Sequence, residues 1–209
     1  MIKCLALCLL LVTCATPELR AQDAPASSST RITAMTGALA HTSALVVDPA
    51  GSSDTRLSAG PAFGLEVQYS VFSSASIYAG IAGSFSMLEH GANLGVAAGP
   101  GTSAATVILG TTGLTFEARD WFDNLRPTAR LGAGVKMYSF TANGASSYTA
   151  LTGDVGVGFR GGSGPIEVLG EIRFLPSSFD QARLPLRGLA PQDQQQNDLL
   201  FTVGITIRP

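Results

Sequence analysis

The stretch Leu57–Val71, with the sequence LSAGPAFGLEVQYSV, decides the fold of this protein. From Leu57 onward every second residue is apolar, and the residues between them are small or polar, including Glu66 and Gln68. Successive side chains of a β-strand point to opposite faces, so this alternation predicts a strand with one apolar face and one polar face. The stretch is also long enough to cross a membrane as a tilted strand, which takes about 9–11 residues.

The same alternation recurs along the rest of the chain. It is clear in three further segments, at residues 76–87, 166–174 and 199–207. Weaker patterns predict strands near residues 31–42, 105–118, 127–139 and 150–160, and the first of these is ambiguous in register because its two faces are similar in polarity. The sequence therefore predicts an all-β protein, an up-and-down antiparallel β-barrel of about eight strands.

The connections between the predicted strands alternate in length. Short links are expected at residues 73–75, 120–125 and 161–165, and longer ones, rich in Gly, Ser, Pro, Asn and Gln, at 43–55, 89–104, 140–149 and 176–198. Barrels of bacterial outer membranes have short periplasmic turns and longer extracellular loops. The alternation of lengths thus predicts a transmembrane barrel with both ends of the chain on the periplasmic side.

The N-terminus has the features of an export signal. Lys3 precedes an apolar run of about a dozen residues, and small and polar residues follow that run. This is the pattern of a secretory signal peptide, and the run is shorter than the roughly 20 apolar residues of a membrane helix. We expect a signal peptide at 1–21, cleaved after Ala21, a short N-terminal segment at 22–30 and the barrel at 31–209.

The cysteines and the charges exclude several classes of function. The three cysteines, Cys4, Cys8 and Cys14, all lie in the expected signal peptide, so the exported chain has no disulfide, thiolate metal site or cysteine nucleophile. Lipidation at Cys14 is the alternative, but Thr13 is a poor residue before a lipidated cysteine. Charged residues make up only 13% of the chain, about half the usual share in soluble domains.

Net charge gives no sign of a nucleic-acid partner. The expected signal peptide takes two of the 13 basic and one of the 15 acidic residues, which leaves a net charge of −3. A soluble lipocalin-like barrel is the alternative fold, but such a barrel turns its apolar face inward and carries more charge outside.

If the apolar face contacts lipid, the opposite face fills the lumen of the barrel. Five acidic and five basic residues lie on that face: Glu66, Glu117, Asp154, Glu167, Glu171, Arg130, Lys136, Arg160, Arg173 and Arg208. An eight-stranded barrel is just wide enough for side chains to fill it, and buried charges persist when they are paired. We therefore expect a structural salt-bridge network in the lumen instead of a pore.

The last predicted strand resembles the assembly signal of outer-membrane barrels. Thr202, Gly204 and Ile207 match its polar, glycine and hydrophobic positions, whereas Pro209 stands where a terminal aromatic residue is usual. Together with the strand plan, residues from about 30 to 209 resemble the small eight-stranded barrels of the OmpA, OmpX and OmpW type. The resemblance implies the outer membrane of a diderm bacterium, insertion by the barrel assembly machinery and contact with outer-membrane lipids, and we expect a monomer.

Two non-enzymatic functions are compatible with such a barrel. The first is a structural or surface-interaction role, in which an extracellular ligand contacts the loops; the largest expected surface is 176–198, with Arg183, Arg187 and the polar run Gln192–Asn197. The second, which the resemblance to OmpW implies, is a carrier or narrow channel for small hydrophobic compounds. Four inward glycines could leave space for it: Gly132, Gly134, Gly156 and Gly158.

An enzyme that modifies lipid is the third and least favoured function. It would need a serine, a histidine base and an orienting acid or amide. The chain has only two histidines, His41 near the outer end of the first strand and His90 in a long loop, and we expect both at the surface. We find no metal-ligand spacing and no cofactor-binding motif, and we predict neither catalytic residues nor a cofactor.

Overall fold

The computed structural model describes residues 30–47, 54–90, 101–118, 124–142, 144–162, 164–184 and 193–209. Eight long strands dominate it: β1 (Thr30–His41), β3 (Gly60–Phe72), β4 (Ala75–His90), β5 (Gly101–Glu117), β6 (Leu125–Phe140), β7 (Tyr148–Gly161), β8 (Ile166–Asp180) and β9 (Asp193–Ile207). Two short elements accompany them, the strand β2 (Arg56–Leu57) and the 3-10 helix η1 (Gln181–Arg183). None of the described residues forms a helix with the length and hydrophobicity of a membrane span.

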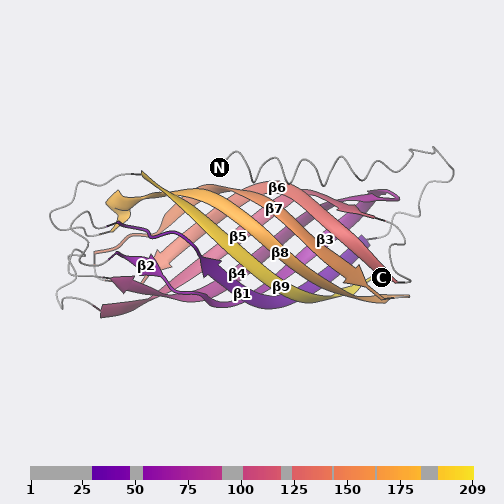
Figure 1. Ribbon diagram of the computed structural model, residues 1–209, viewed down its shortest axis with the longest axis horizontal. Coiled ribbons are helices and arrows are strands. Elements are labelled where there is room, and N and C mark those ends of the chain that lie inside the picture. The colour runs from indigo at the N-terminus through magenta and orange to yellow at the C-terminus, as the bar shows by residue number, and fades with distance from the viewer. Residues whose placement is uncertain are drawn as a thin grey trace.

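The eight long strands close into a barrel. Each pairs antiparallel with the next one along the chain, and β9 returns to β1, so that the ring has no open edge. The strands run obliquely across the long axis of the barrel (Figure 1). The predicted all-β, up-and-down antiparallel barrel is therefore confirmed.

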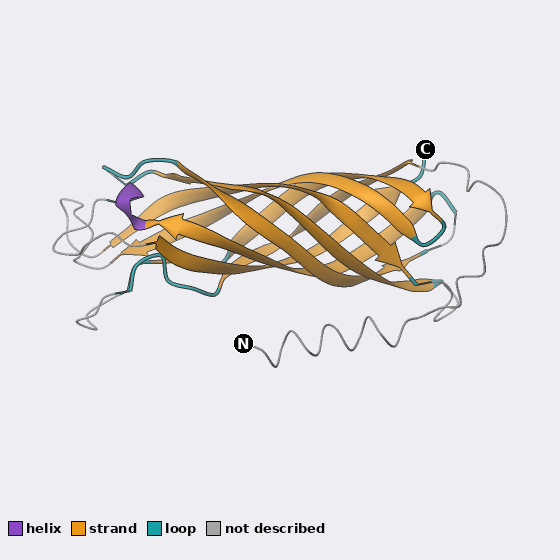
Figure 2. Cartoon of the chain, turned by 90° about the horizontal axis from the view of Figure 1, so that it is seen from above, coloured by secondary structure: helices purple, strands orange, loops and turns teal. Residues whose placement is uncertain are grey.

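The two ends of the barrel differ in their connections. One end carries Thr30, Pro209 and the two-residue turn Ser73–Ser74, and we call it the turn end. The other end carries β2 and η1, and we call it the loop end. Figure 2 shows η1 at the loop end and the C-terminus at the opposite, turn end.

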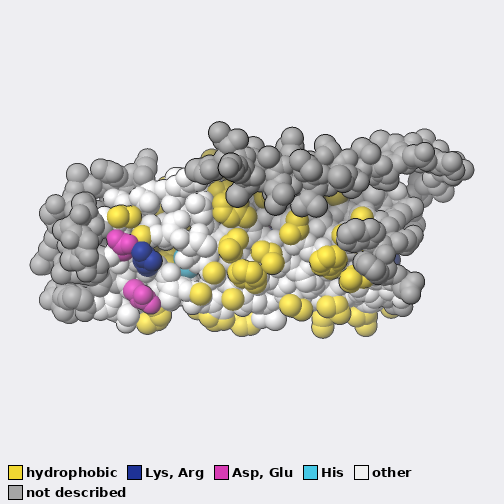
Figure 3. Space-filling model, in the orientation of Figure 1, with side chains coloured by type: hydrophobic (Ala, Val, Ile, Leu, Met, Phe, Trp, Pro, Cys, Tyr) yellow, Lys and Arg dark blue, Asp and Glu magenta, His cyan; other side chains and the backbone are white. Residues whose placement is uncertain are grey.

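The alternation of the sequence sorts the side chains into an outer and an inner face. In β3, Phe63 is 56% exposed, whereas Glu66 is 1% exposed. Hydrophobic side chains spread over the middle of the visible face in Figure 3, and the visible charged side chains gather towards the loop end. Among the described residues, the exposed charged side chains are Arg56, Glu89 and Arg183, all at the loop end. The apolar face thus points outward, the reverse of a lipocalin-like barrel.

The structure resolves the ambiguous register of β1. Ile32 is exposed and pairs with Val67 of β3 and Ile207 of β9, which are also exposed. Arg31 and Thr33 therefore point into the lumen. This register adds an arginine to the lumen that the sequence analysis did not assign there.

A β-bulge accommodates Pro61 at the start of β3. Both β2 and β3 pair with β4, but Leu57 pairs with Leu88 whereas Ala62 pairs with Ser84. The five residue steps from Leu57 to Ala62 thus lie opposite the four steps from Ser84 to Leu88, which is the arrangement of a bulge. Proline donates no backbone hydrogen bond, and a bulge is a place where a sheet tolerates one.

The largest difference from the sequence prediction lies between β8 and β9. The segment 176–198 was expected to be a loop, but Pro176 pairs with Asn197 and Asp180 pairs with Asp193. Both strands continue towards the loop end, beyond the belt of exposed apolar side chains that surrounds the barrel. The outward residues there are polar, so hydrophobic alternation no longer indicates a strand. The polar run Gln192–Asn197 is therefore mostly paired strand, while Arg183 lies on η1. Arg187 lies outside the described residues.

Candidate functional site

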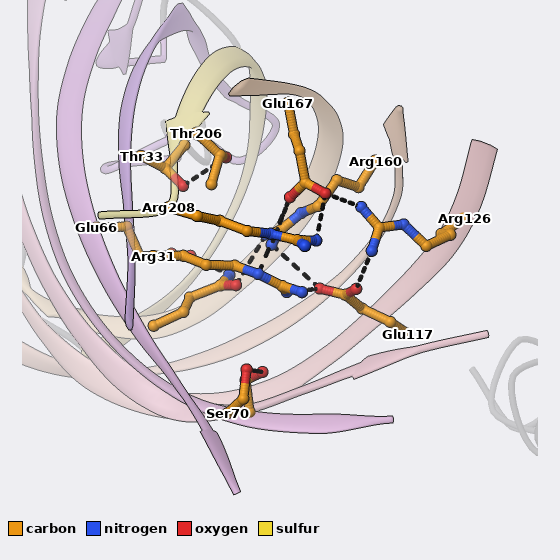
Figure 4. Close-up of polar contacts among 12 residues, drawn as sticks. Arg31, Thr33, Glu66, Ser70, Glu117, Arg126, Arg160, Glu167, Thr206 and Arg208 are labelled. Atoms are coloured by element: carbon orange, nitrogen blue, oxygen red, sulfur yellow. Dashed lines mark hydrogen bonds and ion pairs between the residues drawn. The ribbon is translucent and has the colours of Figure 1, made fainter. Parts of the chain in front are cut away.

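The lumen is the place where polar and charged side chains of the barrel meet, and it is filled in layers. The layer nearest the turn end, which we call the arginine cluster, consists of four arginines and two glutamates: Arg31, Arg126, Arg160, Arg208, Glu117 and Glu167. Figure 4 shows these side chains pointing towards one another from different strands. Alternation along the strands turns these side chains inward, and the stagger of the strands around the closed barrel brings them to the same layer.

The two glutamates of the arginine cluster are shared among the arginines. Glu117 accepts a hydrogen bond from Arg31, and its oxygens lie 3.1 Å from Nη1 of Arg160 and 3.5 Å from Nη1 of Arg126. Glu167 accepts hydrogen bonds from Arg126 and Arg208, and Oε2 lies 3.9 Å from both Arg31 Nε and Arg160 Nη1. Each carboxylate is thus in contact with three or four guanidinium groups.

The next layer, which we call the central network, consists of Glu66, Tyr78, Arg130, Asp154, Glu171 and Arg173. Arg130 Nη2 lies 2.7 Å from Glu66 Oε2, and Arg130 Nε lies 3.0 Å from Glu171 Oε1. Asp154 accepts hydrogen bonds from Arg173 and, at 2.7 Å, from Tyr78 Oη. The Arg130 guanidinium also lies 4.2 Å from the centre of the Tyr78 ring. Each charge in this layer therefore has a partner of opposite sign.

Gln68 links the two layers. Its side-chain amide donates to Glu66 at 2.7 Å, and its carbonyl accepts from Arg160 at 2.8 Å. A chain of polar contacts thus runs from the turn end to the middle of the barrel.

The inward glycines do not leave a path through the lumen. A Cβ at Gly132 would overlap the Tyr78 hydroxyl, and a Cβ at Gly156 would lie 3.0 Å from Arg173 Cγ. At Gly134 and Gly158 the added atom would overlap a backbone oxygen of the neighbouring strand. The space that these glycines were expected to leave for a channel is occupied by side chains or by the neighbouring backbone.

The half of the lumen nearer the loop end is apolar. We call its buried core the apolar plug: Leu39, Leu45, Val46, Leu57, Leu88, Val107, Leu109, Leu175, Phe179, Leu184 and Leu200. The Phe179 ring packs edge-on at 5.4 Å, between centroids, against both Tyr138 and Tyr148. A void of about 10 Å³ among Leu39, Val107 and Leu200 has about the volume that one water molecule needs. Buried aliphatic and aromatic side chains therefore fill this part of the lumen.

A small polar group is embedded in the plug. His41 Nδ1 lies 2.9 Å from Asp198 Oδ1, and His41 Nε2 lies 3.2 Å from Ser86 Oγ. Lys136 Nζ donates to Asp198 at 2.7 Å, to the Leu175 carbonyl at 2.9 Å and to Ser177 at 3.0 Å. The prediction of a surface histidine is wrong at His41, whose side chain is 0% exposed.

His41 lies between Ser86 and Asp198, as the histidine of a catalytic triad lies between its serine and its acid. The neighbouring residues, however, are arranged as in a structural contact. Lys136 shares the carboxylate of Asp198, and the three side chains are buried. Acyl transfer also requires room for a reacting carbonyl near hydrogen-bond donors for its oxygen. Ser86 is 5% exposed, so its hydroxyl is largely shielded from solvent. The side chain of His90 lies outside the described residues.

The structure places nine of the ten predicted lumen residues in the buried interior and Arg208, with its side chain 32% exposed, at the rim of the turn end. Lys136 lies apart from the other nine, because it belongs to the small polar group embedded in the plug. The sequence analysis missed Arg31, Arg126, His41 and Asp198. Asp198 continues the inward series of β9 one step beyond the predicted strand start, so extending the alternation by one residue would have found it.

The three residues of the predicted assembly signal lie on both faces of β9. Thr202 and Gly204 face the lumen, and Ile207 is exposed near the turn end.

Comparison with known proteins gives a structural match without a sequence match. No family model and no curated protein matches this chain. Among solved structures, the chain is similar to the neisserial surface protein NspA, with a TM-score of 0.56 and 9% identity over 86% of this chain and 97% of that one. The fold is that of the small eight-stranded outer-membrane β-barrels. At this identity the similarity to an outer-membrane barrel shows the fold alone.

A second outer-membrane barrel resembles this chain more distantly. The attachment invasion locus protein Ail of Yersinia pestis, solved in complex with the heparin analogue sucrose octasulfate, has a TM-score of 0.45 and 11% identity over 86% of this chain and 97% of that one.

Proposed function

We propose that the protein is an integral outer-membrane β-barrel with a closed lumen, which has a structural, non-enzymatic role and offers its loop end for contacts outside the cell. The observation that carries the proposal is the belt of exposed apolar side chains around a closed barrel; among the described residues, the fully exposed charges lie at the loop end and the partly exposed Arg126 and Arg208 at the turn end, on either side of that belt. A lysine or arginine facing lipid near the bilayer centre costs roughly 2–4 kcal/mol. Outer-membrane lipids are therefore the first partner that we propose.

The route to the membrane follows from the sequence expectations. We propose that residues 1–21, which lie outside the described residues, direct export, and that the barrel assembly machinery recognises Thr202, Gly204 and Ile207. The outward side chain of Ile207 supports this role, because it is available to a partner on the outer face of β9. We propose a monomer, since the closed ring has no open edge for pairing with another chain.

Cysteine labelling tests the orientation. The native cysteines all lie within residues 1–21, so a single cysteine is informative in the exported chain. On intact cells, a membrane-impermeant maleimide should label Gln195→Cys, at the loop end, and leave the matched variant Ser74→Cys, at the turn end, unlabelled until the envelope is opened. Labelling of Ser74→Cys alone on intact cells would contradict the proposed orientation.

Conductance tests the closed lumen against the channel alternative. The central network, the occupied glycine sites and the plug all support a lumen without an open path. In a planar lipid bilayer the purified protein should give no steady conductance above the background. Regular conductance steps would instead favour the narrow channel.

The Ser86–His41–Asp198 contact favours one alternative, an enzyme that acts on lipid esters. A fluorophosphonate probe reacts with activated serines, so the wild-type protein should label no more strongly than Ser86→Ala. His41→Ala should leave the lipid composition of the envelope unchanged. Labelling that disappears in both variants, with a change in lipid composition, would make the enzyme the better account.

A further inference from the structure

The arginine cluster carries more positive charge than its carboxylates balance. Four guanidinium groups meet the carboxylates of Glu117 and Glu167, which leaves a net charge of +2 among the described residues of this layer. The central network has three carboxylates and two guanidinium groups, a net charge of −1, and reaches the cluster through Gln68. Positive charge is therefore concentrated at the turn end.

Hydrogen-bond donors are also in excess in the cluster. Four guanidinium groups offer about twenty N–H donors, whereas two carboxylates offer about eight lone-pair positions. Four buried donor atoms of the cluster have no hydrogen-bond partner in the described part of the chain, the Nε atoms of Arg31, Arg160 and Arg208 and Nη1 of Arg160, against one buried acceptor, Glu167 Oε2. Buried donors without acceptors destabilise a structure, so the cluster favours a further acceptor.

The cluster is both enclosed and reachable. The side chain of Arg160 is 0% exposed and that of Arg31 is 9% exposed, so the inner donors are shielded from solvent. Arg126 and Arg208, with side chains 20% and 32% exposed, form the solvent-facing side at the turn end. The arginines converge on the interior of the barrel in Figure 4. An anion entering from the turn end would meet exposed donors first and buried donors next.

We propose that the arginine cluster is a binding site for a phosphate group. A phosphate presents several oxygens that match the planar fork of a guanidinium, and its negative charge offsets the positive excess. The group can come from a soluble phosphate on the periplasmic side or from the headgroup of a phospholipid at the membrane surface. This site goes beyond the proposed structural role, and phosphate binding is measurable whether or not that role is correct.

Phosphate binding to the purified barrel is the test. In a phosphate-free maltoside detergent, equilibrium dialysis with radiolabelled inorganic phosphate, at constant ionic strength set by chloride, should show saturable binding of one phosphate per barrel. The thermal unfolding midpoint should rise with phosphate and saturate over the same concentration range, because a ligand of the folded state stabilises it. No saturable binding to the wild-type barrel would overturn the proposal.

Paired arginine variants assign the site. Arg126→Gln with Arg208→Gln should weaken binding at least about tenfold, since each loses a charged hydrogen bond to the ligand. The matched control, Arg56→Gln with Arg183→Gln at the loop end, should bind as the wild type does. Equal binding by both double variants would overturn the assignment. Wild-type binding is measured first, so a variant that fails to fold does not remove the test.

Displacement by a phospholipid distinguishes the two sources of the phosphate group. Phosphatidylglycerol added to the micelles should displace radiolabelled phosphate if a phospholipid headgroup is the occupant, and should have no effect if a soluble phosphate is.

Asp120 and Asp123 lie outside the described residues and are acidic groups near Arg126 in sequence. Phosphate binding by the double variant Asp120→Asn with Asp123→Asn, but not by the wild type, would show that the chain supplies its own counter-ion. This result would overturn the proposal.

Discussion

The two halves of the lumen are closed by different interactions. The turn-end half is filled by shared ion pairs around Arg130 and Arg160, whereas the loop-end half is filled by apolar side chains such as Phe179 and Leu200. A buried ion pair depends on both partners, because removing one leaves an uncompensated charge. An apolar core loses stability in proportion to the cavity that a deletion creates. The comparison predicts that the two halves respond differently to single substitutions.

The largest effect is expected at Arg130, in the charged half. Arg130→Ala leaves the buried carboxylates of Glu66 and Glu171 without their shared partner. Breaking a buried pair in this way costs about 3–5 kcal/mol. Urea unfolding of the barrel in detergent or lipid measures the loss, and an unchanged midpoint would show that the ion pairs of the central network contribute little to stability.

The apolar half should respond nearly as strongly. Leu200→Ala removes a buried side chain from the plug, where substitution of leucine by alanine costs about 2–5 kcal/mol, depending on how far the site collapses. Ser178→Ala, an exposed position at the loop end, is the matched control. The same unfolding assay applies, and equal midpoints for the two variants would indicate that the plug is loosely packed.

The outer face offers a third comparison. Val157→Arg places a charge in the apolar belt, where it should cost roughly 2–4 kcal/mol in a lipid bilayer. Gln195→Arg places the same charge on the outer face nearer the loop end, where we expect almost no effect. Unfolding from lipid vesicles separates the two variants, and equal stability would argue against a lipid-facing belt.

The smallest effect is expected at the exposed ion pair of the loop end. Arg56 Nη2 lies 2.6 Å from Asp54 Oδ2, with the Arg56 side chain mostly exposed. Exposed pairs of this kind contribute about 0–1 kcal/mol, so Arg56→Ala should leave the unfolding midpoint nearly unchanged. A loss as large as that of Arg130→Ala would remove the distinction between buried and exposed pairs.

Alternation in the sequence was enough to predict the strands and, except in β1, their two faces, because a period of two is a local property of the chain. It did not reveal the outer parts of β8 and β9, where the outward residues no longer form an apolar face and the strands are defined by their pairing. Arg31 was missed because the two faces of β1 are similar in polarity, and Arg126 because β6 begins before the predicted start at residue 127.

The sequence did not predict which inward-facing residues contact one another in the lumen. Alternation places Glu66 and Arg130 on the inner face, but their separation of 64 residues leaves the layer in which they meet undefined. That layer follows from the stagger of the strands around the closed barrel. The same reason explains why His41 was not expected beside Asp198, since their strands come from opposite ends of the chain and pair only on closure.

The most direct test of the central claim, a closed barrel in the outer membrane, is the gel mobility of the protein from isolated outer membranes, with and without boiling. A detergent-resistant barrel remains compact until it is heated, so the protein should be found in the outer-membrane fraction and should change its mobility on boiling. A protein found in the soluble periplasmic fraction, with the same mobility before and after boiling, would contradict the account.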